Sequence, residues 1–168
     1  MSTPASTKFS VGDYITDFEN IYKIFGKQIA SDYHHQKCTY LLYRPIDPAE
    51  KNQATFSIPV DNVQKSGLRH PINSEHIKEI YSILKKPLKS PDYIDPKTIK
   101  EILYQNDPLK TVFVLKQLVV SKKELGEKFP KNLQELITNI TEHLSAEIAF
   151  VSKKSLESVQ KEIQKLTK

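Results

Sequence analysis

The feature that most constrains the fold is a change of hydrophobic period within residues 54–84, which read ATFSIPVDNVQKSGLRHPINSEHIKEIYSIL. The first part alternates as a strand does, and we expect its inward side chains to be Phe56, Ile58 and Val60. From residue 74 onward the apolar side chains recur three and four apart, which is typical of an amphipathic helix. A strand that leads so directly into a helix indicates a boundary between a β part and an α part.

The residue pattern before this boundary predicts strands. Segments 9–15, 37–46 and 55–60 are rich in branched and aromatic residues, and segment 20–33 reads as a strand pair or one bent strand. Pro59 has no N–H to donate, so it suits an edge strand or a strand end. Short strands at this density predict a small, curved, barrel-like sheet.

The residue pattern after this boundary predicts five helices that form a compact bundle. Each helix has a capping residue or a proline near its start, and these signals are Ser74, Asp95-Pro96, Asp107-Pro108, Pro130 and Ser152. The helix that begins near Pro108 has the broadest apolar stripe, which includes Phe113, and we expect it to be the buried centre.

Composition excludes several classes of protein. A chain of 168 residues with 38% hydrophobic residues can bury a core, and no apolar run approaches the roughly 20 residues that cross a bilayer. We expect residues 1–7 to be a disordered tail. The single cysteine, Cys38, allows no intramolecular disulfide and fits a reducing cytoplasm; we expect it to be buried in a strand. The net charge of +5 permits a polyanionic partner without requiring one.

The residues give little support for an enzyme. The only cluster of metal-ligand type is HHQKC at residues 34–38, and zinc needs three or four converging donors. We interpret this cluster as a polar turn. The sequence lacks a glycine-rich phosphate loop and the HExxH and GxSxG motifs. We therefore predict no catalytic residue, no metal and no cofactor.

A tyrosine and the lysines around it form the candidate nucleic-acid site. Tyr93 lies between two prolines, and the flanking cations are Lys85, Lys86, Lys89, Lys97 and Lys100. Cations around a projecting aromatic side chain can grip phosphates while the ring wedges a base step. The alternative is a solvated helix face with the tyrosine folded back on the core.

The order of several segments resembles the CarD family of bacterial transcription regulators. These segments are FSVGDYI, TYLLYRPI, TFSIPVDNVQKSGLR and, after the long helices, LSAEIAFV, and the resemblance covers roughly residues 8–167. It implies an α+β chain with a Tudor-like polymerase-interacting β-barrel at 8–72 and an all-α helical domain at 73–168. A chain similar to this family is expected to be a monomeric, non-catalytic protein of the bacterial cytoplasm, associated with the nucleoid.

The resemblance also implies two partners. The front domain is expected to dock on the RNA polymerase β subunit near Gln28, Phe56 and Ser57, with strand-to-strand pairing. The helical domain is expected to contact promoter DNA weakly and without sequence preference, to modulate open-complex formation. Tyr93 stands about where family members usually carry the tryptophan that wedges into the minor groove.

The chain departs from the family pattern at three places. Family members commonly have HGVG shortly after the first strand, where this chain has FENIYKIFG. The residue just before VP in the fourth strand is often basic in the family, and here it is Ser57. The chain also contains no tryptophan. Two alternatives therefore remain open. The chain is a diverged member with another partner, or a protein-interaction adaptor that has no DNA contact.

Overall fold

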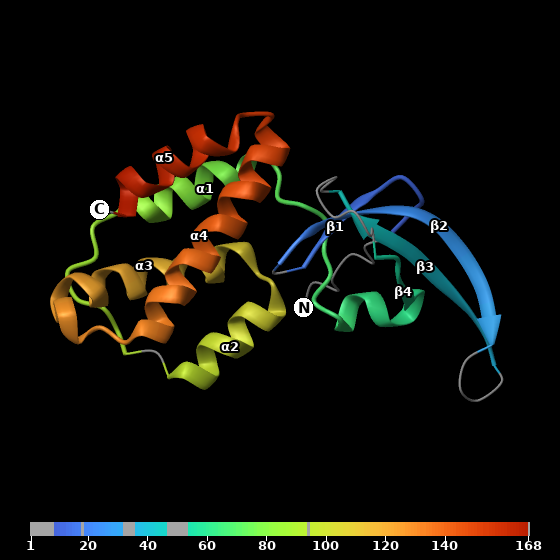
Figure 1. Ribbon diagram of the computed structural model, residues 1–168, viewed down its shortest axis with the longest axis horizontal. Helices are drawn as coiled ribbons and strands as arrows, with labels where there is room; N and C mark the ends of the chain where they lie inside the picture. Colours follow the sequence, from blue (N-terminus) through green and yellow to red (C-terminus); the bar gives the residue numbers. More distant parts are fainter. Residues whose placement is uncertain (1–8, 18, 32–35, 47–53, 94, 168) are drawn as a thin grey trace, which may run out of the picture. The chain divides into compact units, whose positions relative to one another are not determined.

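The chain divides into two compact units, residues 1–70 and 71–168. The structure is a computed structural model that describes residues 9–17, 19–31, 36–46, 54–93 and 95–167. The first unit is a sheet and the second is helical, so the predicted α+β class is confirmed (Figure 1). The division falls two residues before the expected boundary.

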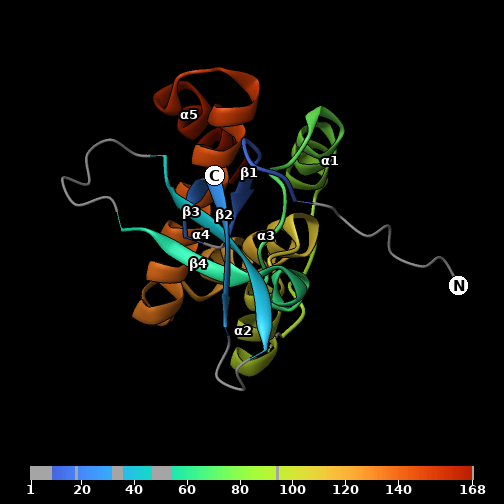
Figure 2. The same cartoon turned by 90° about the vertical axis from the view of Figure 1, so that its right-hand side faces the viewer.

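The sheet unit contains four antiparallel strands in the order β1-β2-β3-β4. The strands are β1 (Tyr14–Thr16), β2 (Ile21–Ser31), β3 (Lys37–Pro45) and β4 (Phe56–Pro59). Segment 20–33 is thus one strand over its described part, and a register shift between Ile24 and Gly26 bends it. The long β2–β3 pair runs on beyond the short strand β4 in Figure 2.

The described strands form an open sheet, and the predicted closed barrel is not seen among them. Strand β4 ends at Pro59, where the chain turns into the 3-10 helix η1 (Val60–Lys65). After η1 the chain returns to β1, where Arg69 forms an isolated antiparallel bridge with Thr16, but this single bridge adds no fifth strand to the sheet. Pro59 does lie in an edge strand, as its missing N–H predicts.

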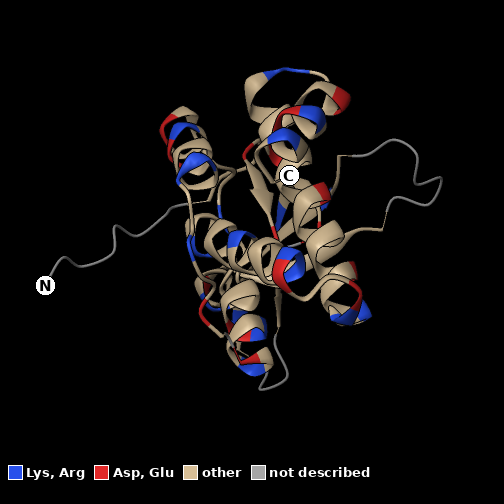
Figure 3. Cartoon of the chain, turned by 90° about the vertical axis from the view of Figure 1, so that its left-hand side faces the viewer, with Lys and Arg blue, Asp and Glu red and all other residues tan. Residues whose placement is uncertain are grey.

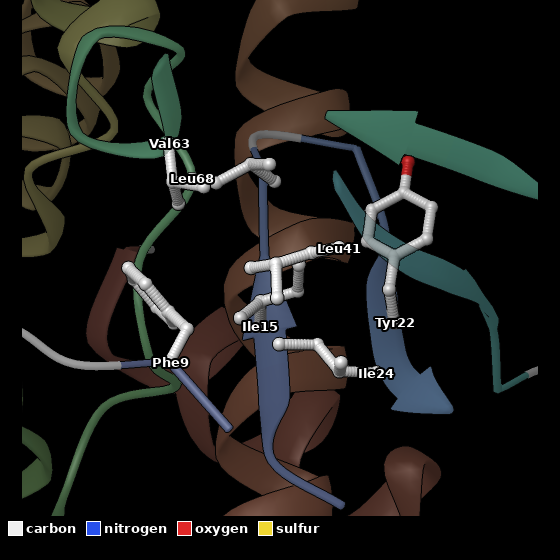
Figure 4. Packing of buried hydrophobic residues seen from close by; sticks show 7 residues of the cluster. All are labelled: Phe9, Ile15, Tyr22, Ile24, Leu41, Val63 and Leu68. Carbon is white, nitrogen blue, oxygen red and sulfur yellow. The ribbon is translucent and has the colours of Figure 1, made fainter. Parts of the chain in front are cut away.

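The sheet unit has its own hydrophobic core, shown in Figure 4. Its members are Phe9, Ile15, Tyr22, Ile24, Leu41, Val63 and Leu68. Two of the side chains predicted to point inward do not join it, because Phe56 and Val60 are each 40% exposed. Val60 belongs to η1 rather than to the strand, which removes it from the alternation. Cys38 on β3 is half-buried rather than buried.

The helical unit contains the five predicted helices. They are α1 (Ser74–Lys85), α2 (Pro96–Gln105), α3 (Pro108–Leu125), α4 (Lys131–Ser152) and α5 (Leu156–Thr167), with the 3-10 helix η2 (Gly126–Lys128) before α4. Asp95 and Asp107 cap α2 and α3 through their carboxylates, as predicted.

The other two predicted caps are wrong. Asn73, not Ser74, caps α1, because its side chain accepts from the backbone N–H of His76 in a capping box. Helix α4 continues through Ser152 and ends at Lys153, whose φ of 57° is left-handed. The side chain that accepts from the first turn of α5 is Ser155.

Helix α3 is the centre of the helical unit, as its broad apolar stripe predicts. It contacts α1, α2 and α4, and its buried side chains include Val112, Leu115 and Leu118. Phe113 lies outside this core with 47% of its surface exposed, so its predicted place in the stripe is wrong. Within the described residues, no helix combines the length and the apolar character needed to span a membrane.

Candidate nucleic-acid interface

Tyr93 lies in the segment that joins α1 to α2, and 88% of its surface is exposed. The ring is therefore not folded back onto the hydrophobic core. A tyrosine that projects into solvent leaves its apolar ring face available, while water hydrates its hydroxyl. The Tyr93 side chain is thus accessible from solvent.

A buried glutamine holds the backbone next to Tyr93. The side chain of Gln117 on α3 is 1% exposed, and its Oε1 accepts a hydrogen bond of 2.9 Å from the backbone N–H of Asp92. Two residues after Tyr93, the Asp95 carboxylate accepts from the backbone N–H groups of Lys97 and Thr98 at 3.1 and 3.2 Å. These hydrogen bonds hold the backbone at Asp92 and at the start of α2. A polar residue inside the apolar stripe of α3 is the sequence signal that points to Gln117.

The predicted DNA-contacting lysines fall into two groups. Lys89, Lys97 and Lys100 are exposed in the segment that carries Tyr93 and on α2. Lys85 and Lys86 instead lie at the end of α1, beside a groove between α1 and α5. Helix α3 lies between α1 and α2 in Figures 1 and 2, and it contacts both. The fold therefore does not gather all five lysines around one ring.

Other charges dilute the basic character of the helical unit. Figure 3 shows lysine and arginine spread over several helices, with acidic residues between them. Lys97 lies 4.0 Å from Glu101, but its side chain is 84% exposed, so this ion pair is weak and leaves the cation accessible. The candidate interface is a local one around Tyr93.

The predicted polymerase-facing residues lie on two faces of the sheet. Ser57 pairs with Leu42 and Gln28 pairs with Tyr40, and because Leu42 and Tyr40 are two positions apart on β3, all four share one face. Phe56 is next to Ser57 on β4 and points to the opposite face. Its ring packs near Tyr43 and Tyr22, with ring centroids 5.6 and 5.7 Å apart.

Two cation–aromatic contacts occur on the face that carries Gln28 and Ser57. Lys23 Nζ lies 5.6 Å from the centre of the Tyr14 ring, and the Arg44 guanidinium lies 5.3 Å from that of Phe25. Lys23 and Arg44 pair directly across β2 and β3. Arg44 is two positions after Leu42, the partner of Ser57, so it lies on the same face as Ser57. This face therefore carries positive charge although Ser57 itself is neutral. Strand periodicity does not reveal these pairs, because they depend on register.

The possible metal cluster lies mostly outside the described residues, which begin again at Gln36. Among the residues that are described, no group of three or more His, Cys, Asp or Glu side chains is placed to hold a metal ion.

A scan against protein-family models finds no match, and a search of curated proteins finds none either.

Proposed function

We propose that this chain is a non-catalytic regulator of transcription initiation that binds the RNA polymerase β subunit and promoter DNA. The ordered resemblance of its segments to the CarD family supports the proposal, as does the pairing of a β unit with a five-helix unit. The protein acts in the bacterial cytoplasm, where it modulates the stability of the open complex.

The observation that carries the proposal is the exposure of Tyr93. Its ring is 88% exposed, and hydrogen bonds to Gln117 and Asp95 anchor the chain at Asp92 and at the start of α2. Lys89 and Lys97 supply phosphate contacts, which position a protein without reading sequence. We therefore expect weak, salt-sensitive binding with little sequence preference.

Docking on the polymerase uses the edge of the sheet. Strand β4 is an edge strand, and an added strand gains main-chain hydrogen bonds whatever its side chains are. Lys23 and Arg44 provide positive charge on the face that also carries Ser57. They can replace the basic residue that this chain lacks at Ser57.

The direct test is substitution of Tyr93 in the full chain. Tyr93→Ala should shorten the open-complex lifetime by roughly tenfold, since stacking of a base on an aromatic ring is worth about 1–3 kcal/mol. Tyr93→Trp should maintain or lengthen it, because indole has more apolar surface. The melting temperature should not change, because the ring is exposed. Lifetime is measured on a promoter fragment with polymerase present.

Tyr104→Ala is the matched control. Tyr104 is an aromatic residue on α2 that is 71% exposed and is expected to contact nothing in this proposal. Equal effects of the two alanine variants, or no effect of either, would contradict the wedge. That result would favour the second candidate, a protein-interaction adaptor, for which the exposed aromatic side chains of Tyr14 and Phe25 on the sheet unit provide a surface.

A further inference from the structure

The helical unit contains a groove of about 920 Å³ between α1 and α5. Lys78, Tyr81, Ser82 and Lys85 line it from α1. These positions are spaced by three and four, so they form one stripe along that helix. Across the groove, α5 contributes a second stripe that includes Lys165.

The rim of the groove is positive. Lys78, Lys85, Lys86 and Lys165 all line it and are all exposed. The acidic lining residue is Glu162, and its carboxylate already accepts hydrogen bonds from the Tyr81 hydroxyl at 2.6 Å and from Lys154 Nζ at 2.9 Å. Lys154 and, from the rim, Lys165 both interact with Glu162, whereas Lys78, Lys85 and Lys86 face no other carboxylate of the groove lining.

The positive charge continues around the end of α1. A smaller hollow of about 270 Å³ shares Lys85 and Lys86 with the groove and adds Lys116 and Lys123 from α3. Lys116 Nζ donates to the backbone carbonyl of Lys86, and burial together with the Lys86 charge lowers the pKa of Lys116. The smaller contribution, from Lys86, reflects the closeness of the positive charges at this end of α1.

The groove has an apolar floor that phosphates would not use. Tyr81 and Leu166 are half-buried, whereas the lysines are exposed, so apolar surface lies below a cationic rim. The stripe from Lys78 to Lys85 is roughly 10 Å long at a rise of about 1.5 Å per residue, which suits a short peptide.

We propose that the α1–α5 groove binds an acidic peptide segment of a partner protein. Carboxylates of the segment pair with the rim lysines, and an apolar side chain between them packs on Tyr81 and Leu166. The DNA contact around Tyr93 is not needed for this binding, so the inference goes beyond the proposed function and does not depend on it.

The test uses the full chain and a short fluorescent peptide in which Glu and Leu alternate. Fluorescence anisotropy at low salt measures the affinity. Two control peptides carry Gln for every Glu or Ser for every Leu, and both should bind at least several-fold more weakly. The double variant Lys78→Glu, Lys165→Glu should weaken binding by roughly tenfold, since each exposed ion pair is worth about 0.2–1 kcal/mol and becomes repulsive.

A double variant with the same change of charge is the control. Lys128→Glu, Lys131→Glu alters exposed lysines at η2 and at the start of α4, away from the groove lining, and should leave peptide affinity unchanged. Circular dichroism confirms that each variant is folded. The milder Lys78→Gln, Lys165→Gln variant replaces the first pair if charge reversal unfolds the protein.

Three results with peptides would overturn the proposal. They are no binding of the Glu-Leu peptide, equal binding of its Gln or Ser counterpart, and equal affinity of the groove and control variants. Single-stranded and duplex DNA are titrated in parallel. A larger loss of DNA binding than of peptide binding in the groove variant would assign the lysines to nucleic acid and would also overturn it.

Discussion

At the scale of single residues, a buried glutamate holds the start of the helical unit. Glu147 on α4 is 1% exposed, and its Oε1 accepts a hydrogen bond of 2.9 Å from the backbone N–H of Ile72. Its Oε2 lies 3.8 Å from His143 Nε2. Ile72 is itself 4% exposed, so its N–H would have no access to water without this acceptor. The glutamate therefore fixes the backbone that leads into α1.

Removal of this acceptor should be costly. Glu147→Ala leaves a buried N–H unsatisfied and should lower the free energy of unfolding by about 2–3 kcal/mol. Glu147→Gln keeps an oxygen at the same position and should cost about 1 kcal/mol. Urea unfolding of both variants checks the difference. Equal, small losses would mean that water satisfies the Ile72 N–H when the carboxylate is gone.

At the scale of elements, a side-chain hydrogen bond links α1 to α5. The Tyr81 hydroxyl donates to Glu162 at 2.6 Å, and Lys154 donates to the same carboxylate. The hydrogen bond from Tyr81, with that from Lys154, holds the pKa of Glu162 below its usual value. Burial and the neighbouring carboxylate raise the pKa of Tyr81, which stays protonated. The contact is thus favoured by an ionised Glu162 and a neutral Tyr81.

This contact predicts a dependence of stability on pH. Because the pKa of Glu162 is lower in the folded chain, its contribution is complete above the ordinary carboxyl pKa of 4.5 and is lost as pH falls through the folded pKa. Glu162→Gln should therefore lower the melting temperature at neutral pH and reduce its fall in acid. Thermal melting from neutral to acid pH measures both.

Glu157→Gln is the control for this prediction. Glu157 lies on the same helix and pairs with Lys161, but that pair joins no other helix. If the two glutamine variants show the same acid profile, the link between Glu162 and Tyr81 contributes nothing specific.

At the scale of the whole molecule, the two units have separate cores. The sheet core extends from Phe9 to Leu68, and the described helical unit begins at Pro71. We expect a fragment of residues 1–72 to fold alone, with a low but cooperative stability because small domains bury little surface. Urea unfolding followed by circular dichroism tests this.

The same fragment tests polymerase docking. If the sheet unit carries that contact, the folded fragment should retain the β-subunit lobe in a pull-down, and the full chain serves as the positive control. A fragment that is folded and does not bind, while the full chain does, would show that the contact needs the helices. Failure of both to bind would contradict docking.

The sequence by itself determined the helical elements and the α+β class. Asp95-Pro96 and Asp107-Pro108 predict helix starts. The proline already has a helical φ and needs no N–H in the first turn, and the aspartate side chain accepts hydrogen bonds from the N–H groups that follow. The broad apolar stripe of α3 predicted that this helix is buried at the centre of the helical unit, because apolar side chains on most of a helix surface must be covered by other helices. These signals depend on residues a few positions apart, so they can be recognised in the sequence without knowing the fold.

Only the tertiary structure decided how the sheet pairs and which residues form each site. Gln28 and Ser57 share one face of the sheet because of the register of β2 and β4 on β3. The backbone beside Tyr93 is held by Gln117, a residue 25 positions from Asp92. Lys85 faces α5 across a groove rather than joining Tyr93. Each of these contacts joins residues far apart in the chain, and their geometry depends on packing that local propensity and hydrophobic period do not encode.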